Sequence, residues 1–145
     1  MLFDRDDLEE ILDIPISLEL FNLQRVINNI TEEHLNNMKA SLDQMKAALK
    51  TKDIRLFVEA DEQFHQSLFL PVGNKLLLKL LNIFWSLLAN AKDFNDLADP
   101  DLEAGYHKHL KIYEALASKD YELLYQRTNE HYKSTEERIS KIQRS

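Results

Sequence analysis

The sequence contains no cysteine and only two glycines and three prolines among its 145 residues. Without cysteine, the chain has no disulfides, thiolate metal ligands or cysteine nucleophiles. So few glycines and prolines argue against a β-sandwich with many turns, while 44% hydrophobic and 30% charged residues argue against a disordered chain. These observations favour a helical protein, and the length suits a single domain, 1–145.

Positive charge is also scarce, with 18 lysines and arginines against 25 acidic residues and a net charge of −7. A nucleic-acid surface needs clustered positive charge, so this balance disfavours direct binding of nucleic acid. The most apolar stretch, 76–91, is interrupted by Lys79 and Asn82, and it is shorter than the roughly 18–20 residues that span a bilayer. The first residues do not resemble a signal peptide. We therefore expect a cytoplasmic chain that does not enter a membrane.

Capping and turn residues predict where the helices begin and end. We expect about six helices, the first divided by Pro15 into 6–12 and 16–28, and the others starting at Thr31, starting at Asp53, and covering about 74–97, 100–117 and 120–142. Apolar residues in the helix from Thr31 recur at spacings of three and four, which indicates an amphipathic helix that faces a core. The predicted fold class is all-α, an antiparallel helical bundle.

Polar side chains occupy core-facing positions in three of these helices. In the helix from Asp53, Asp61 and His65 share the apolar face and lie four residues apart, the spacing at which a helix offers two ligands to one metal ion. His109 and His131 take inward positions in the last two helices. Each lies eleven residues from Asp120, so an antiparallel hairpin brings the two histidines face to face.

One carboxylate and three imidazoles suit zinc, nickel, iron, manganese or cobalt. Taken singly, an inward histidine is more often a core residue hydrogen-bonded to a neighbour. Four such groups together would each need a separate buried partner, which favours a metal site. A tetrahedron of four protein ligands would be structural, whereas an octahedral ion keeps two positions open for water or a bidentate anion. The other histidines, His34 and His107, occupy positions typical of a solvated face.

The order of these residues resembles the FCD domain, the C-terminal effector-binding domain of FadR-subfamily regulators in the GntR family. The resemblance extends from Leu18-Glu19 to His131. It includes the pattern D-x-x-F-H at 61–65, the turn at 73–74, and the pattern H-x2-I-x2-A-x4-D-x10-H at 109–131. It implies a helical bundle that holds a small organic acid beside a metal ion.

The resemblance implies that the family's metal ligands correspond to Asp61, His65, His109 and His131. The expected metal is zinc, with nickel, iron or manganese as alternatives. Asn74 is the expected contact for the carboxylate effector, and Pro15 stands where many family members have an arginine near the effector. The resemblance implies a homodimer that reaches DNA only through a separate N-terminal winged helix-turn-helix domain, which we expect to be absent from this chain. No catalytic residue is implied.

Two other functions stay open at this point. A metal site with open positions could activate water, so the chain could be a helical-bundle metalloenzyme acting on a small organic acid. Alternatively, the metal could be purely structural and the chain a dimerisation module, in which case chelation would destabilise it without any effect of a ligand. No phosphate-binding loop, nucleophile elbow or HExxH pattern is present in the sequence.

Overall fold

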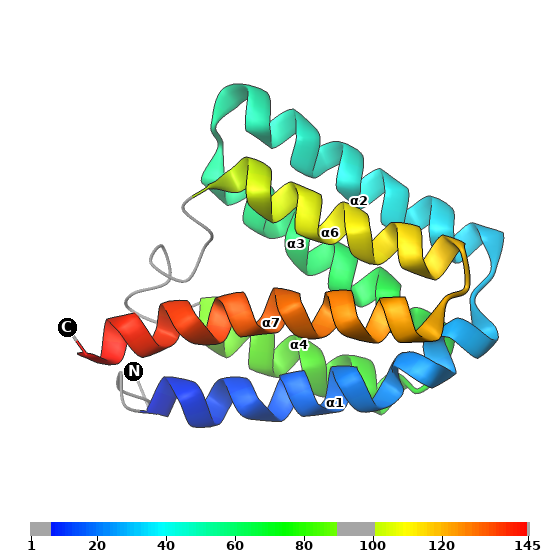
Figure 1. Ribbon diagram of the computed structural model, residues 1–145, viewed down its shortest axis with the longest axis horizontal. Coiled ribbons are helices and arrows are strands. Elements are labelled where there is room, and N and C mark those ends of the chain that lie inside the picture. Colours follow the sequence, from blue (N-terminus) through cyan, green and yellow to red (C-terminus); the bar gives the residue numbers. More distant parts are fainter. Residues whose placement is uncertain (1–6, 90–100, 145) are drawn as a thin grey trace.

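The computed structural model describes residues 7–89 and 101–144, and within them all regular structure is helical (Figure 1). The prediction of an all-α bundle is confirmed. The helices are α1 (Leu8–Asn29), α2 (Glu32–Thr51), α3 (Ile54–Phe69), the short 3₁₀ helix η2 (Leu70–Val72), α4 (Lys75–Ala89), α6 (Leu102–Ala117) and α7 (Tyr121–Arg144). The part of the predicted helix 74–97 beyond Ala89 lies outside the described residues.

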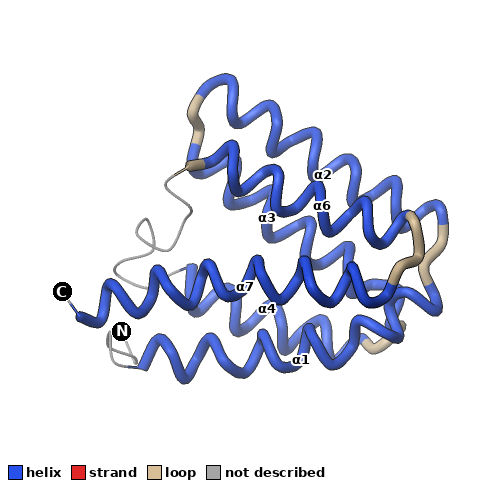
Figure 2. The backbone as a smooth tube through the Cα atoms, in the orientation of Figure 1, coloured by secondary structure: helices blue, strands red, loops and turns tan. Residues whose placement is uncertain are grey.

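The α-helices form two groups, as the backbone tube in Figure 2 shows. Helices α2, α3 and α6 pack together on one side, and α1, α4 and α7 pack together on the other. The α6–α7 hairpin joins the two groups, and α3 also contacts α1 and α4. The start of α1 lies beside the end of α7 (Figure 1), where the Ser140 hydroxyl donates a 3.0 Å hydrogen bond to Glu9.

The predicted interruption at Pro15 is wrong, because α1 runs without a break through 22 residues. Proline inside a helix removes one backbone hydrogen bond and costs about 3 kcal/mol. Apolar side chains on both sides of Pro15 pack against α7 and α4 in a small core cluster, which consists of Leu8, Ile11, Leu12, Ile16, Leu88, Tyr132 and Ile139. Burial on both sides of the proline holds the helix together, so tertiary packing outweighs the local preference.

Side-chain caps explain the starts of α2, α3 and α6, among others. The Thr31 hydroxyl accepts a hydrogen bond from the backbone of His34, and the His34 ring accepts one from the backbone N–H of Thr31 at 3.1 Å. Asp53 caps α3 through Leu56 and Asp101 caps α6 through Ala104. His34 therefore belongs to a helix cap, a role that its predicted position on a solvated face did not include.

The core consists of two clusters that meet near the middle of the bundle. The larger cluster is built mainly from α2, α3 and α6 and includes the fully buried Phe64, and the smaller one lies between α1 and α7. The ring of His65 contacts Phe64 of the larger cluster and Tyr132 of the smaller one. The polar residues predicted from the sequence thus lie at the junction of the two cores.

Candidate metal centre

The structure brings Asp61, His65, His109 and His131 together. Each offers one potential ligand atom, and these atoms all lie within 4.8 Å of one another. The four side chains come from α3, α6 and α7. The three histidines are buried, and the Asp61 side chain, 35% exposed, lines a cavity.

Asp61 is the centre of the hydrogen-bonded cluster. Its Oδ1 lies 2.7 Å from Nε2 of His109 and 3.1 Å from Nε2 of His65. The contact with His65 follows from the helical spacing within α3, whereas the contact with His109 depends on the packing of α6 against α3. The ring of His109 also meets the edges of Phe64 and His131, at centroid distances of 5.1 and 4.5 Å. These contacts fix the orientation of the His109 ring.

In His65 and His109, the ring nitrogen that faces away from Asp61, Nδ1, has a carboxylate or carbonyl oxygen as a partner. Such oxygens commonly accept a hydrogen bond from metal-ligating histidines. Nδ1 of His65 lies 2.9 Å from Oε1 of Glu19, a fully buried carboxylate of α1, and 3.3 Å from the Tyr132 hydroxyl. Nδ1 of His109 donates to the carbonyl oxygen of Gly105 at 2.7 Å. A carboxylate or carbonyl at the outer nitrogen orients the ring and leaves the inner nitrogen to coordinate a metal.

Among the described residues, Nδ1 of His131 is buried without a hydrogen-bond partner. Leaving such a buried polar atom unpaired costs about 1–3 kcal/mol. His131 also offers one potential ligand atom within 4.8 Å of those of Asp61, His65 and His109. The orphaned nitrogen of His131 and the donor set of one carboxylate and three imidazoles fit a bound metal ion of the zinc, nickel, iron or manganese type.

Electrostatic interactions place a proton on His65 and keep His131 neutral. Burial alone would lower the pKa of His65, but the Glu19 charge and hydrogen bonds to Asp61 and Glu19 raise the pKa to about 10. Burial would likewise raise the pKa of Asp61, but the charges and hydrogen bonds of His109 and His65 hold it well below its ordinary value. Burial and the charges of His109 and His65 lower the pKa of His131 well below its usual range.

All four cluster residues line one cavity of about 120 Å³ between α3, α4, α6 and α7. Its wall is mostly apolar, with Trp85 and Leu88 from α4, and it also includes Lys108 of α6 and Arg138 of α7. The volume is below the roughly 300 Å³ at which typical ligand pockets begin, so it suits a small molecule.

The structure does not bring Asn74 to this cavity. Asn74 lies in the turn before α4, where its Oδ1 accepts a 3.0 Å hydrogen bond from the backbone N–H of Leu77. It therefore caps α4 and is not among the residues that line the cavity.

Glu19 also belongs to the site, although the spacing rules that bring the four potential ligands together do not place it there. It lies on the buried face of α1, among the apolar positions 16, 23 and 26. A carboxylate at such a position is itself a signal, because a buried charge needs a partner. The sequence does not show that the partner is His65, which lies 46 residues away along the chain.

An all-α bundle with a buried Asp/His cluster beside a small cavity describes a ligand-binding domain. Residues 10–134 match the FCD domain family, so the chain belongs to that family. It is thus the effector-binding type of domain found in GntR-type transcription regulators, which contradicts the metalloenzyme alternative. Within the described residues, no helix is both long and apolar enough to cross a membrane.

Two relatives are helix-turn-helix transcriptional regulators of Bacillus subtilis. The chain is 27% identical to YcbG over 138 residues, which covers 94% of the chain and 56% of YcbG. It is 27% identical to YdhC over 128 residues, which covers 87% of the chain and 57% of YdhC. The chain therefore spans little more than half the length of these two regulators.

Solved structures show the same fold. Escherichia coli McbR/YncC superimposes with a TM-score of 0.83 at 16% identity, over 95% of this chain and 66% of that one. The metal-free FCD domain of TM0439 superimposes with a TM-score of 0.77 at 22% identity, over 97% of this chain and 96% of that one.

Proposed function

We propose that this chain is the metal-dependent effector domain of a FadR-subfamily transcription regulator and that its effector is a small carboxylate. The observation that carries the proposal is the cluster of four potential ligand atoms within 4.8 Å of one another, all lining the same cavity. A purely structural cluster would not need to face a cavity. Asp61, His65, His109 and His131 would hold the metal ion.

Zinc is the first candidate for the metal, with nickel, iron and manganese as alternatives, because one carboxylate and three imidazoles suit all four. When bound, the ion supplies positive charge that attracts carboxylate oxygens. The residues of the chain do the rest: Glu19 and Gly105 orient two of the imidazoles, and the apolar cavity wall excludes water from a small acid. Asn74 stays a predicted effector contact, although it lies outside the lining of this cavity and its side-chain oxygen caps α4.

The cluster can couple ligand binding to the packing of the bundle. Its residues connect α3 with the α6–α7 hairpin, and the buried contact between Glu19 and His65 adds α1. A ligand that binds one arrangement of these helices more tightly than another shifts the population toward that arrangement. In a full-length regulator this shift would act on a separate winged helix-turn-helix domain, through which the protein would bind DNA in the cytoplasm.

A second copy of the chain is the proposed partner of α4. Its exposed large apolar residues include Leu76, Leu80 and Ile83, which are 66%, 38% and 54% exposed. Their spacing of four and three places them on one face of the helix. Covering this face in a homodimer would remove a contiguous apolar stripe from water.

Elemental analysis of the purified chain tests the metal site directly. We expect near-stoichiometric metal in the wild-type chain, loss of metal in His109→Ala, and retention in His107→Ala. His107 is the matched control, because its side chain is 55% exposed and points away from the cluster toward Glu103.

A thermal-shift screen of small carboxylates, with and without chelator, tests the effector. The proposal predicts an acid that raises the melting temperature only of the metal-loaded chain. If chelation strongly lowers the melting temperature but no acid changes it, the metal is structural and the chain is a dimerisation module. If neither the wild-type chain nor His109→Ala binds metal after reconstitution, the four residues form only a buried polar network.

A further inference from the structure

A second cavity lies next to the one that holds the Asp/His cluster, between α1, α3 and α4. His65 and Trp85 line both cavities. The second cavity has a volume of about 10 Å³, and a water molecule in a protein interior needs roughly 10–15 Å³. It therefore suits a single water molecule and is too small for an organic ligand.

Two residues that line this second cavity each have a buried polar atom without a hydrogen-bond partner among the described residues. The atoms are Oε2 of Glu19, a fully buried side chain of α1, and Nε1 of Trp85 on α4. The other oxygen of the Glu19 carboxylate, Oε1, lies 2.9 Å from Nδ1 of His65. An unpaired polar atom away from water is costly, and an unpaired carboxylate oxygen costs more than a neutral group. Both atoms therefore point to a small polar ligand in this cavity.

The chemistry of the two atoms selects water over an ion. A carboxylate oxygen only accepts hydrogen bonds, and an indole N–H only donates them. One water molecule can donate to Oε2 of Glu19 and accept from Nε1 of Trp85 at the same time. A cation would face the positive end of the indole N–H dipole, and an anion would face the Glu19 carboxylate, so either ion would be repelled by one of the two groups.

The wall of the cavity offers further polar groups. Gln66 of α3 and Asn82 of α4 line it, and Nε2 of Gln66 donates a hydrogen bond to Oδ1 of Asn82. Buried water molecules typically make about three hydrogen bonds. Glu19 and Trp85 supply two of them, and the two amide side chains are candidates for the third.

We propose that one buried water molecule bridges Oε2 of Glu19 and Nε1 of Trp85. The bridge connects α4 to the carboxylate that orients His65, and so connects α4 to the Asp/His cluster. The same helix presents the exposed apolar face described above, and a movement of this helix would reach His65 through the bridge. The site needs neither a metal ion nor an effector, so the inference goes beyond the proposed function.

Nuclear magnetic resonance of the ¹⁵N-labelled chain tests the inference, because its single tryptophan gives one indole N–H signal. We expect a cross-peak between this proton and water, with the sign of the nuclear Overhauser effect that marks a long-lived bound water molecule. The cross-peak should persist under chelation, because the proposed water does not depend on a metal ion. An indole proton without this cross-peak would overturn the inference and leave the proposed function intact.

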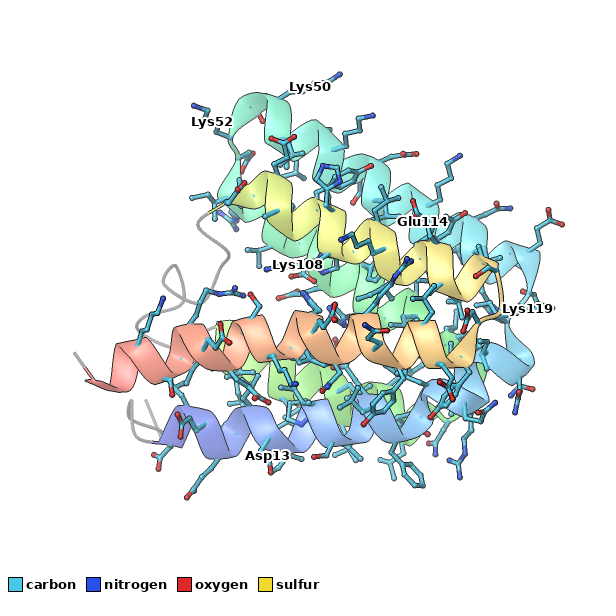
Figure 3. All side chains as sticks on the ribbon, in the orientation of Figure 1. Asp13, Lys50, Lys52, Lys108, Glu114 and Lys119 are labelled. Carbon is cyan, nitrogen blue, oxygen red and sulfur yellow. The ribbon has the colours of Figure 1, made fainter. Side chains whose placement is uncertain are left out.

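Glu19→Met removes the carboxylate and keeps a side chain of similar length, so the cross-peak should be lost. Asp13→Met is the matched control and should keep it. Asp13 is an exposed acidic residue of the same helix, it lies on the outer side of α1 in Figure 3, and it does not line this cavity. Circular dichroism and melting temperature establish that each variant is folded. A cross-peak of unchanged intensity in folded Glu19→Met contradicts the bridge.

A crystal structure of the wild-type chain is a second test that needs no variant. We expect density for one water molecule within about 3.2 Å of both Oε2 of Glu19 and Nε1 of Trp85. A direct hydrogen bond between these two side chains, or an ion in this cavity, would show that the assignment of water is wrong.

Discussion

Metal binding should release a proton from His65. In the metal-free protein, Glu19 and Asp61 raise the pKa of His65 to about 10, so His65 is protonated at pH 7.5. A metal ion needs the unprotonated nitrogen. The gap between pH 7.5 and a pKa of about 10 corresponds to roughly 3 kcal/mol, at about 1.4 kcal/mol for each pKa unit. The apparent affinity for metal should therefore rise about tenfold for each pH unit between pH 6.5 and 8.5.

The stability of the metal-free protein depends on pH in the opposite direction to its affinity for metal. Because folding raises the pKa of His65 above its ordinary value of 6.5, protonated His65 stabilises the fold. This stabilisation is fully present below pH 6.5 and is lost as the pH rises through about 10. Raising the pH thus weakens the metal-free fold while it strengthens metal binding.

Calorimetric titration of zinc at pH 7.5, in buffers of different ionisation enthalpy, counts the protons released. We expect about one proton from the wild-type chain and from the His107→Ala control. Glu19→Gln should release fewer, because the Glu19 charge is the largest of the contributions that raise the pKa of His65. Zinc binding with no proton release, and with an affinity that does not change between pH 6.5 and 8.5, would refute the reasoning.

Three further predictions concern stability. Phe64→Ala removes a fully buried ring that meets His65 and His109 edge-on, so urea denaturation should show a loss of about 3–5 kcal/mol; a loss below about 1 kcal/mol would contradict the packing. Asp53→Ala removes the cap of α3 and should cost about 1 kcal/mol in the same assay, whereas Asp43→Ala, within α2, should have little effect. Chelation of the metal-loaded protein should lower its melting temperature in wild type but not in His109→Ala, and an equal change in both would contradict the assigned ligands.

The two pairs of the cluster could be predicted from the sequence because one simple geometric rule determines each pair, whereas the meeting of the two pairs depends on the packing of α6 against α3. Helical periodicity places Asp61 and His65 on one face, and the equal distance of His109 and His131 from the α6–α7 turn places them opposite each other. The structure shows that these pairs meet, on three helices that pack at the centre of the bundle. Neither rule depends on tertiary contacts beyond the existence of a bundle.

Other features depend on contacts between distant segments, and local rules gave the wrong answer or none. Pro15 is a helix breaker by local preference, but packing of α1 on α7 overrides it. The pairing of Glu19 with His65 requires the register of α1 against α3, which no spacing encodes. Asn74 is a different case, because an asparagine at a helix start is a common cap, and that simpler role is the one the structure shows.

Because α1 runs through Pro15 without a break, a rotation of the helix would move all of it together. Glu19 lies about 15 Å from the end of α1 at Asn29, and Leu8 lies about 32 Å from the same end, at about 1.5 Å for each residue. Any rotation of α1 about Asn29 therefore moves Leu8 about twice as far as it moves Glu19. In a helix broken at Pro15, the larger displacement of Leu8 would be lost, because the segment before the proline could turn independently. A small displacement of His65 would thus be amplified at the far end of the molecule.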